Sequence, residues 1–155
     1  MKKTNAARIL DRLKINYKLV EYTVDENDLS AEHLAETARL PVEKVYKTLV
    51  ARGDRNGIFV CVVPGAVPLN LKKAAKASGN KKAAMVLMKE LEPLTGYIRG
   101  GCSPLGMKKN YPVFIDESAF EQEKIFISAG QRGLQLHLTP SDLQKATGAR
   151  AVPLT

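Results

Sequence analysis

Two largely apolar runs, separated by a short polar segment, predict how the middle of this chain folds. Gly53-Asp54-Arg55-Asn56-Gly57 separates the largely apolar segment 47–51, which begins with Lys47, from the apolar residues 58–63. Glycine, asparagine and aspartate accept the backbone conformations of tight reversals, so this pattern is typical of a β-hairpin. We therefore predict two antiparallel strands joined at residues 53–57.

The rest of the chain mixes helical and strand periodicity without a regular βαβ repeat. Candidate helix N-caps are Thr4 or Asn5, Ser30, and Thr139 followed by Pro140 at the first helical position. Helices are predicted over residues 5–14, 31–40, 70–78, 88–94 and 140–147, and strands over 17–23, 47–51, 58–63, 83–87, 97–98, 113–116, 125–128 and 134–138. This arrangement predicts a mixed sheet in an α/β fold.

Length and charge restrict the class of protein. A chain of 155 residues has the size of one domain, since domains commonly span ~100–200 residues, and we expect residues 1–155 to form a single unit. The formal net charge is +8, which favours acidic partners and nucleic acid first among them. The cluster of lysines over residues 72–82 is either a solvated helix face or an RNA-binding surface.

The cysteines and the apolar segments indicate the cellular compartment of the protein. Cys61 and Cys102 are far apart in sequence and form no close-spaced metal or redox pair, which favours a reducing compartment. Charged residues interrupt any apolar stretch near the N-terminus, and the longest apolar run, residues 58–69, contains two prolines and a glycine. We expect a cytoplasmic protein with no membrane partner.

Two glycine-containing loops and one lysine are the candidate site. The loops are Gly100-Gly101-Cys102-Ser103-Pro104-Leu105-Gly106 and Ser128-Ala129-Gly130-Gln131-Arg132-Gly133. Glycine lets the main chain approach a ligand, and unpaired N–H groups in such loops bind anions or polarised carbonyls. Lys47 stands at the head of an apolar strand, where it either reaches solvent or enters a pocket.

Several familiar chemistries are disfavoured. Neither His33 nor His137 has a partner nearby in sequence for a nucleophilic triad, and no clustered ligands suggest a metal. The spacing of neither a Walker A loop nor a dinucleotide-binding loop is present. Nothing around Cys102 lowers the pKa of its thiol, so we expect it to fill a tight loop rather than act as a nucleophile.

Five segments, taken together and in order, resemble the YbaK family of aminoacyl-tRNA deacylases, which is related to the editing domain of prolyl-tRNA synthetases. They are residues 45–49, 69–76, 95–97, 100–109 and 128–134. The resemblance implies a mixed, partly open β-barrel surrounded by helices, no cofactor and no metal. It also implies that Lys47 and Gly101 are catalytic, and that the substrate-binding residues are Tyr22, Thr48, Gly100, Cys102, Ser128, Ala129 and Gly130.

The implied activity is hydrolysis of the ester that joins a wrong amino acid, cysteine first, to tRNA(Pro). In this family the thiol of the substrate cysteine is thought to attack its own carbonyl, and prolyl-tRNA synthetase is a possible partner. Ala129, Cys102 and Gln135 depart from the family pattern, and the aromatic residue expected near Leu29 and Ser30 is missing. These departures leave alanine or another small amino acid open as the target.

The sequence is consistent with three candidate functions. The first is a trans-editing hydrolase of Cys-tRNA(Pro). The second is a non-catalytic tRNA-binding module that uses the lysines of residues 72–82. The third is a hydrolase of a small free ester, which tRNA would not inhibit.

Overall fold

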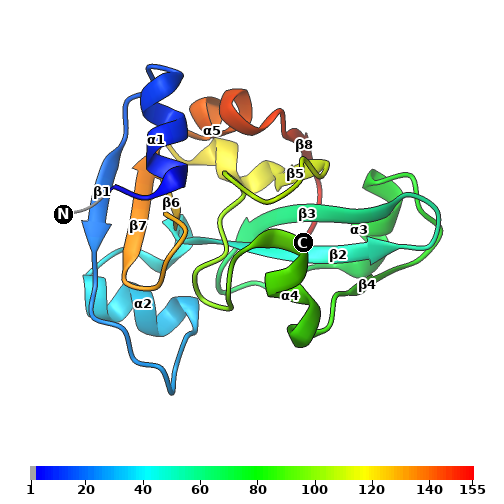
Figure 1. The fold of residues 1–155 in the computed structure, drawn as a ribbon, viewed down its shortest axis with the longest axis horizontal. Coiled ribbons are helices and arrows are strands. Elements are labelled where there is room, and N and C mark those ends of the chain that lie inside the picture. The colour runs from blue at the N-terminus through cyan, green and yellow to red at the C-terminus, as the bar shows by residue number, and fades with distance from the viewer. Residues whose placement is uncertain (1–2) are drawn as a thin grey trace.

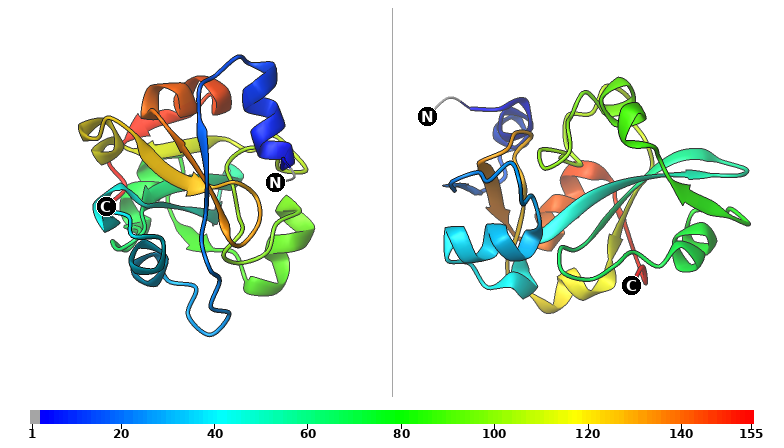
Figure 2. Two further views of the ribbon diagram at one scale, coloured as in Figure 1. Left: turned by 90° about the vertical axis from the view of Figure 1, so that its left-hand side faces the viewer. Right: turned by 90° about the horizontal axis from the view of Figure 1, so that it is seen from below.

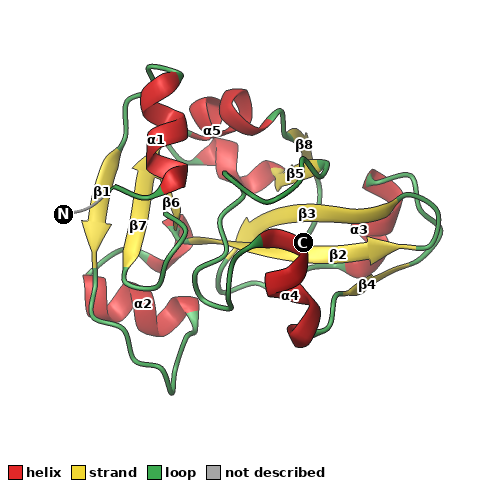
Figure 3. Ribbon diagram, in the orientation of Figure 1, coloured by secondary structure: helices red, strands yellow, loops and turns green. Residues whose placement is uncertain are grey.

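Residues 3–155 of the chain are described by a computed structural model in which short helices surround two β-sheets (Figure 1, Figure 3). In chain order the elements are α1 (Asn5–Arg12), β1 (Lys18–Glu21), α2 (Ala31–Ala38), the 3-10 helix η1 (Val42–Lys44), β2 (Tyr46–Gly53), β3 (Gly57–Pro64), α3 (Leu71–Ala77), β4 (Ala83–Met85), α4 (Met88–Thr95), β5 (Val113–Asp116), the 3-10 helix η2 (Glu117–Glu121), β6 (Ile125–Ser128), β7 (Leu134–Leu138), α5 (Pro140–Thr147) and β8 (Arg150–Val152).

The larger sheet has five strands in the order β4-β2-β3-β5-β8. β2 and β3 form the predicted antiparallel hairpin, with Lys47 opposite Val63 and Gly53 opposite Gly57. β3, β5 and β8 run parallel to one another, so the prediction of a mixed sheet is confirmed. β4 pairs only with the last three residues of β2, which leaves the first part of that edge of β2 without a strand partner among residues 3–155.

The smaller sheet is antiparallel in the order β1-β7-β6. Its β6–β7 pairing sets Ser128 opposite Gln135, so their side chains lie on the same face. A single parallel bridge between Val45 and Phe126 joins this sheet to the start of β2. The second glycine loop connects β6 to β7 and therefore lies close to the uncovered edge of β2.

Helices α3 and α4 cover opposite faces of the five-stranded sheet (Figure 2, right). Ala74 of α3 packs in one buried cluster with Phe59 and Phe114. Leu91 of α4 packs against the main cluster, which contains Val50 and the apolar residues of β6 and β7. The side chains of β2 alternate between the two clusters, as the strand period requires.

The helix ends follow the capping residues of the sequence. Thr4, Ser30 and Thr139 each accept a backbone N–H of the first turn through the side-chain oxygen, which confirms these three caps. α5 ends at Gly148 in the left-handed conformation, as expected. η1 begins after Pro41, as the sequence predicts.

Other local predictions are wrong or too long. Residues 97–98 form no strand, because the Tyr97 N–H donates to Thr95 Oγ1 at 3.0 Å instead of to a neighbouring strand. The second helix ends before Leu40, where Arg39 takes the left-handed conformation and Leu40 N–H donates to Ala35 O. β1 and β4 are shorter than predicted, and β8 and η2 were not predicted.

The carboxylate of Asp116 stabilises the junction between β5 and the C-terminal segment. It is 2% exposed, and its Oδ1 accepts the Leu154 N–H at 2.8 Å, while its Oδ2 accepts the hydroxyl and the N–H of Ser118. We expect Asp116→Ala to lower the free energy of unfolding by about 2 kcal/mol, because the mutation leaves a buried N–H without an acceptor. Urea denaturation measures this loss. The exposed neighbour Glu117 is the control, and Glu117→Ala should change stability by less than about 0.5 kcal/mol.

Candidate functional site

A cavity of about 580 Å³ lies beside the uncovered edge of β2. Its walls come from Val45 and the first residues of β2, the start of α2, the segment after β3, residues 85–88 with Leu91, the first glycine loop and the β6–β7 pair. Most of the lining side chains are apolar, and a few polar groups converge among them. A concave, largely apolar pocket of this size is the usual form of a small-molecule site, since such sites span roughly 300–1,000 Å³.

Lys47 is part of the cavity wall and is half-buried. Burial lowers the pKa of its ammonium group below the usual value, and the carboxylate of Glu32 on α2 opposes that shift. Within residues 3–155 the ammonium makes no hydrogen bond or ion pair, so its charge is free to act on a ligand. Of the two placements that the sequence left open for Lys47, the structure has the one in a pocket.

The main chain of Thr48 faces the cavity. Val50 O accepts a hydrogen bond from Val86 N at 3.1 Å, on the side of β2 that points away from β3. Hydrogen-bonding direction alternates along a strand, so the N–H and C=O of Thr48 point to that same side, beyond the reach of β4. The side-chain Oγ1 of Thr48 is also buried without a hydrogen-bond partner among the described residues.

The two glycine loops are in contact. A Cβ on Gly101 would lie 3.2 Å from Gln131 Cα and 3.3 Å from Arg132 N, so a larger residue here would require the second loop to move by a few tenths of an ångström. Arg132 Nε donates to Arg99 O at 2.8 Å and ties the second loop to the first. Gly101 N–H closes a turn by donating to Ile98 O at 3.0 Å, whereas the N–H groups of Gly100 and Cys102 donate no hydrogen bond within residues 3–155.

The Tyr97 side chain contacts both glycine loops, a role that the sequence analysis did not predict. Its hydroxyl donates to Leu105 O in the first loop, and burial raises the pKa of this hydroxyl to about 12. Its ring lies against Gly130 of the second loop, which has a φ of 105° and would place a Cβ 3.1 Å from Tyr97 Cε1. The sequence signal for this contact is an aromatic residue directly after Gly96 and three positions before the first glycine loop.

Ser128 and Gln135 lie opposite each other in the β6–β7 pair, and both line the cavity. Ser128 Oγ accepts the Gly130 N–H at 3.1 Å and so shapes the second loop. Gln135 is 3% exposed, and its Oε1 has no hydrogen-bond partner among the described residues. A buried acceptor without a partner costs about 1–3 kcal/mol, so Oε1 is available to a ligand that brings a donor.

The structure places the other predicted site residues outside the cavity lining. Gly101 and Gly130 shape the loops as described, and Ala129 is fully buried in the main cluster. Tyr22 is half-buried and donates its N–H to Gly133 O at 3.0 Å, at the end of the second loop. Lys47, Thr48, Gly100, Cys102 and Ser128 are brought together around the cavity.

No activated protein nucleophile lines the cavity among residues 3–155. Burial raises the pKa of the Cys102 thiol to about 12, and the same effect acts on Cys61 in the other cluster. His137 stacks on Phe126 with ring centroids 4.1 Å apart, and His33 lies near Asp25 and Asp28 on the outside of α2. No group of three His, Cys, Asp or Glu residues that could hold a metal occurs in the described part of the chain.

This combination of a mixed α/β fold and a lysine-and-loop pocket defines an editing domain, and the comparisons with known proteins agree. The aminoacyl-tRNA editing domain model matches residues 25–146, so this chain belongs to that family. No helix among residues 3–155 has the length and apolar character needed to cross a membrane.

Three individual proteins illustrate the relationship. EbsC of Enterococcus faecalis, described as a candidate Cys-tRNA(Pro)/Cys-tRNA(Cys) deacylase, is 46% identical over 99% of this chain and 93% of its own length. A proline–tRNA ligase of Thermosipho africanus is 30% identical over 59% of this chain, which is 16% of the ligase. The crystal structure of a candidate trans-editing enzyme for prolyl-tRNA synthetase has a TM-score of 0.83 and 25% identity, covering 100% of this chain and 99% of the other.

These matches confirm the predicted family, its fold class and the class of activity, aminoacyl-tRNA deacylation. The roles of the individual site residues stay predictions.

The raised pKa of Cys102 gives a prediction about its reactivity. At pH 8 a thiol with a pKa of about 12 is ionised in only about one molecule in ten thousand. We expect native protein to react slowly with iodoacetamide at Cys102, and Cys102→Ala to retain most of the deacylase activity. Mass spectrometry of labelled native and unfolded protein measures the first, and fast labelling that abolishes activity would contradict the prediction.

Proposed function

We propose that this protein hydrolyses the ester between a wrong amino acid and tRNA(Pro), with Cys-tRNA(Pro) as the main substrate. One observation carries the proposal: the Lys47 ammonium shares a cavity with buried oxygen atoms of Thr48 and Gln135, and none of these groups has a hydrogen-bond partner within residues 3–155. The family supports the substrate class, and the description of the Enterococcus faecalis relative supports cysteine.

The cavity suits the terminal aminoacyl-adenosine of a charged tRNA. Exposed apolar side chains stand at its rim, with Leu87 57% and Met88 61% exposed, and they offer a surface for the terminal base. Deeper inside, the substrate ammonium or thiol is a donor of the kind that the Gln135 Oε1 lacks. The Thr48 main chain and hydroxyl offer further hydrogen bonds along the uncovered edge of β2.

In this proposal the ester carbonyl oxygen faces the free N–H groups of Gly100 and Cys102. Negative charge develops on that oxygen when the carbonyl is attacked, and fixed donors stabilise it without reorganising. The Lys47 ammonium adds a positive charge whose field is strengthened by its partial burial. Gly101 contributes through the close approach of the two loops, because its own N–H is used within the turn.

The substrate supplies the nucleophile. The cysteine sulfur attacks its own carbonyl carbon, the ester C–O bond breaks, and the tRNA 3′ oxygen leaves with the proton that the thiol gave up. The product thiolactone then reacts with water to give free cysteine. The protein therefore needs only to hold these groups in place, which is worth up to about 7–11 kcal/mol of the barrier.

The alternative target, Ala-tRNA(Pro), has no thiol, so a water molecule would have to attack. The cavity lining has no histidine among the described residues, and Glu32 of α2 is the only carboxylate there that could activate this water. Cysteine brings its own nucleophile and is favoured for that reason, although Cys102, Ala129 and Gln135 depart from the family pattern.

We further infer that prolyl-tRNA synthetase presents the charged tRNA and that the protein is cytoplasmic. The stretch shared with a proline–tRNA ligase supports the first inference, and the two buried, unpaired cysteines support the second. A single editing domain over residues 1–155 stays a prediction.

Lys47 is the direct test. Lys47→Ala should reduce deacylation of Cys-tRNA(Pro) by on the order of 10²–10³-fold, the usual loss when one stabilising group for a developing oxyanion is removed. Release of labelled cysteine from purified charged tRNA measures the rate, with Ala-tRNA(Pro) as a parallel substrate. Lys44→Ala, on η1 and outside the cavity lining, is the matched control. The proposal fails if wild-type protein cleaves neither ester, or if Lys47→Ala is as active as wild type.

Gln135 tests recognition of the amino acid. Gln135→Leu should lower kcat/KM for Cys-tRNA(Pro) about tenfold to hundredfold, because a substrate donor then enters the pocket without an acceptor. The thermal midpoint should stay equal or rise, since the mutation also removes the unpaired oxygen. Gln144→Leu on α5 is the control and should leave kcat/KM unchanged. A loss of stability with unchanged kcat/KM would mean that Gln135 is only structural.

A further inference from the structure

We propose that the surface around α3 binds the phosphate backbone of the tRNA, outside the cavity described above; this inference rests on the proposed function. From Arg55 to Lys89 the chain carries seven cationic side chains and no aspartate or glutamate. The seven are Arg55, Lys72, Lys73, Lys76, Lys81, Lys82 and Lys89. The formal net charge of +8 is therefore concentrated in one stretch of the chain.

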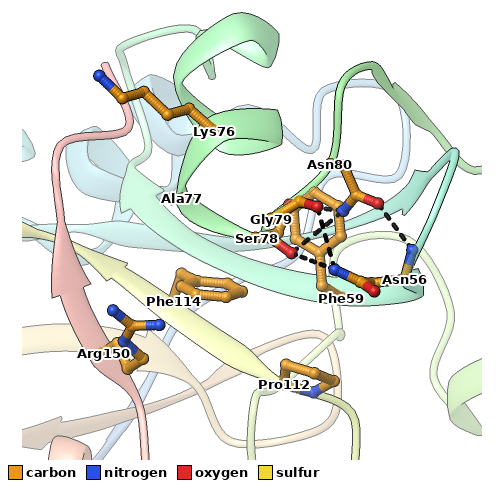
Figure 4. Close-up of a pocket in the computed structure, with 10 residues that line it drawn as sticks. All are labelled: Asn56, Phe59, Lys76, Ala77, Ser78, Gly79, Asn80, Pro112, Phe114 and Arg150. Carbon is orange, nitrogen blue, oxygen red and sulfur yellow. Dashed lines mark hydrogen bonds between the residues drawn. The ribbon is translucent and has the colours of Figure 1, made fainter.

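The fold ties the β2–β3 turn to the segment after α3. Asn80 is buried, and its Oδ1 accepts the N–H group of Arg55 at 2.9 Å. The same Oδ1 accepts the N–H group of Asn56 at 2.8 Å (Figure 4). A Cβ on Gly53 would lie 2.1 Å from the Asn80 side chain, so the strand approaches this amide as closely as a glycine allows. These contacts hold Arg55 beside the lysines at positions 81 and 82.

A second cavity, of about 470 Å³, is lined by cations from two distant parts of the chain. It is lined by Lys76 at the end of α3 and by Arg150 of β8, over the edge-to-face pair of Phe59 and Phe114. Figure 4 shows the Arg150 guanidinium near the Phe114 ring and the Lys76 side chain extending outward from α3. This cavity lies on the α3 face of the sheet.

We call six of these exposed residues the α3 basic surface: Arg55, Lys72, Lys76, Lys81, Lys82 and Arg150. Within residues 3–155 none of their charged groups makes an ion pair or a hydrogen bond. Lys73 is excluded because its ammonium donates to Thr155 O at 2.6 Å. The adjacent acid, Asp54, uses Oδ1 to accept the main-chain N–H groups of Lys81 and Lys82.

An absence of paired acids distinguishes this surface from an ordinary solvated face. Solvated helix faces usually alternate the signs of their charges, and their ion pairs limit the attraction of a polyanion. Here the β2–β3 turn, α3, the segment before β4, and β8 each contribute exposed cations. This is the electrostatic pattern of a site that follows a nucleic-acid backbone. RNA phosphates are therefore the partner that this surface fits.

The surface is connected to the candidate active site by two segments of chain. Lys81 and Lys82 directly precede β4, and residues 85–88 that follow line the larger cavity. Gly65, Ala66 and Pro68 line the same cavity, and the chain leads from them into α3 with Lys72. Because β4 has three residues, it spans only about 10 Å. An RNA strand whose 3′ end enters the cavity is thus within a few nucleotides of the α3 basic surface.

The test compares two charge-reversal variants of equal net charge. Lys81→Glu with Lys82→Glu alters the α3 basic surface, and Lys18→Glu with Lys145→Glu alters exposed residues on β1 and α5. Each is assayed on Cys-tRNA(Pro) and on the minimal substrate 3′-cysteinyl-adenosine. Binding of uncharged tRNA(Pro) is measured between 50 and 200 mM salt.

We expect the first variant to lose about tenfold or more in tRNA affinity at low salt and in kcat/KM on Cys-tRNA(Pro), with the loss in KM. Its plot of log affinity against log salt should be less steep by about 1 for each phosphate contact removed. Cleavage of the minimal ester should stay unchanged, and the control variant should behave like wild type.

The outcomes separate this inference from the proposed function. If wild type cleaves both substrates and the two variants weaken tRNA binding equally, the α3 basic surface is not a specific RNA site and the inference fails alone. It also fails if the first variant loses activity only when prolyl-tRNA synthetase is present, because the surface would then bind the synthetase. If wild type cleaves neither substrate, the proposed function fails as well.

Discussion

An incomplete strand pairing underlies the site of this protein. β4 pairs with only the last three residues of β2, so the main chain around Thr48 has unused donors and acceptors on that edge. Open sheet edges usually attract other strands, and proteins cover or interrupt them. Here α2, α4 and the glycine loops enclose the edge and leave a cavity, so the open edge of β2 offers its hydrogen-bonding groups to the space inside.

The cavity keeps polar groups in positions that are unfavourable without a ligand. Lys47 is partly desolvated, and the oxygen atoms of Thr48 and Gln135 lack partners. Tyr97 makes this arrangement rigid, because one side chain contacts both glycine loops. Groups fixed in this way do not need to reorganise when a transition state forms, which is the physical basis of electrostatic catalysis.

The cavity and the α3 basic surface have different electrostatic characters. The cavity at the β2 edge is mostly apolar and contains one lysine without an ion pair among the described residues, whereas the α3 basic surface carries several such cations. A pocket that acts on an ester needs low solvation, and a surface that attracts a polyanion needs exposed charge. Separation of the two places satisfies both requirements within one small protein.

The amino-acid sequence predicted the features that depend on residues close together along the chain. The turn at residues 53–57, the caps Thr4, Ser30 and Thr139, and the placement of Lys47 at the head of an apolar strand depend on neighbours a few residues away. The family resemblance, carried by five separated segments, added the fold class and the type of reaction. It also named residues that lie around the cavity, though not the hydrogen bonds that they make.

The three-dimensional structure decided which groups remain unpaired. The resemblance named Gly101 as catalytic, but its N–H closes a turn to Ile98, and the loop amides without a partner among the described residues are those of Gly100 and Cys102. Tyr97 was read as part of a strand and instead supports both loops. Hydrogen-bond partners, burial and the meeting of Lys76 with Arg150 involve residues distant along the chain, so they are determined only when the chain is packed.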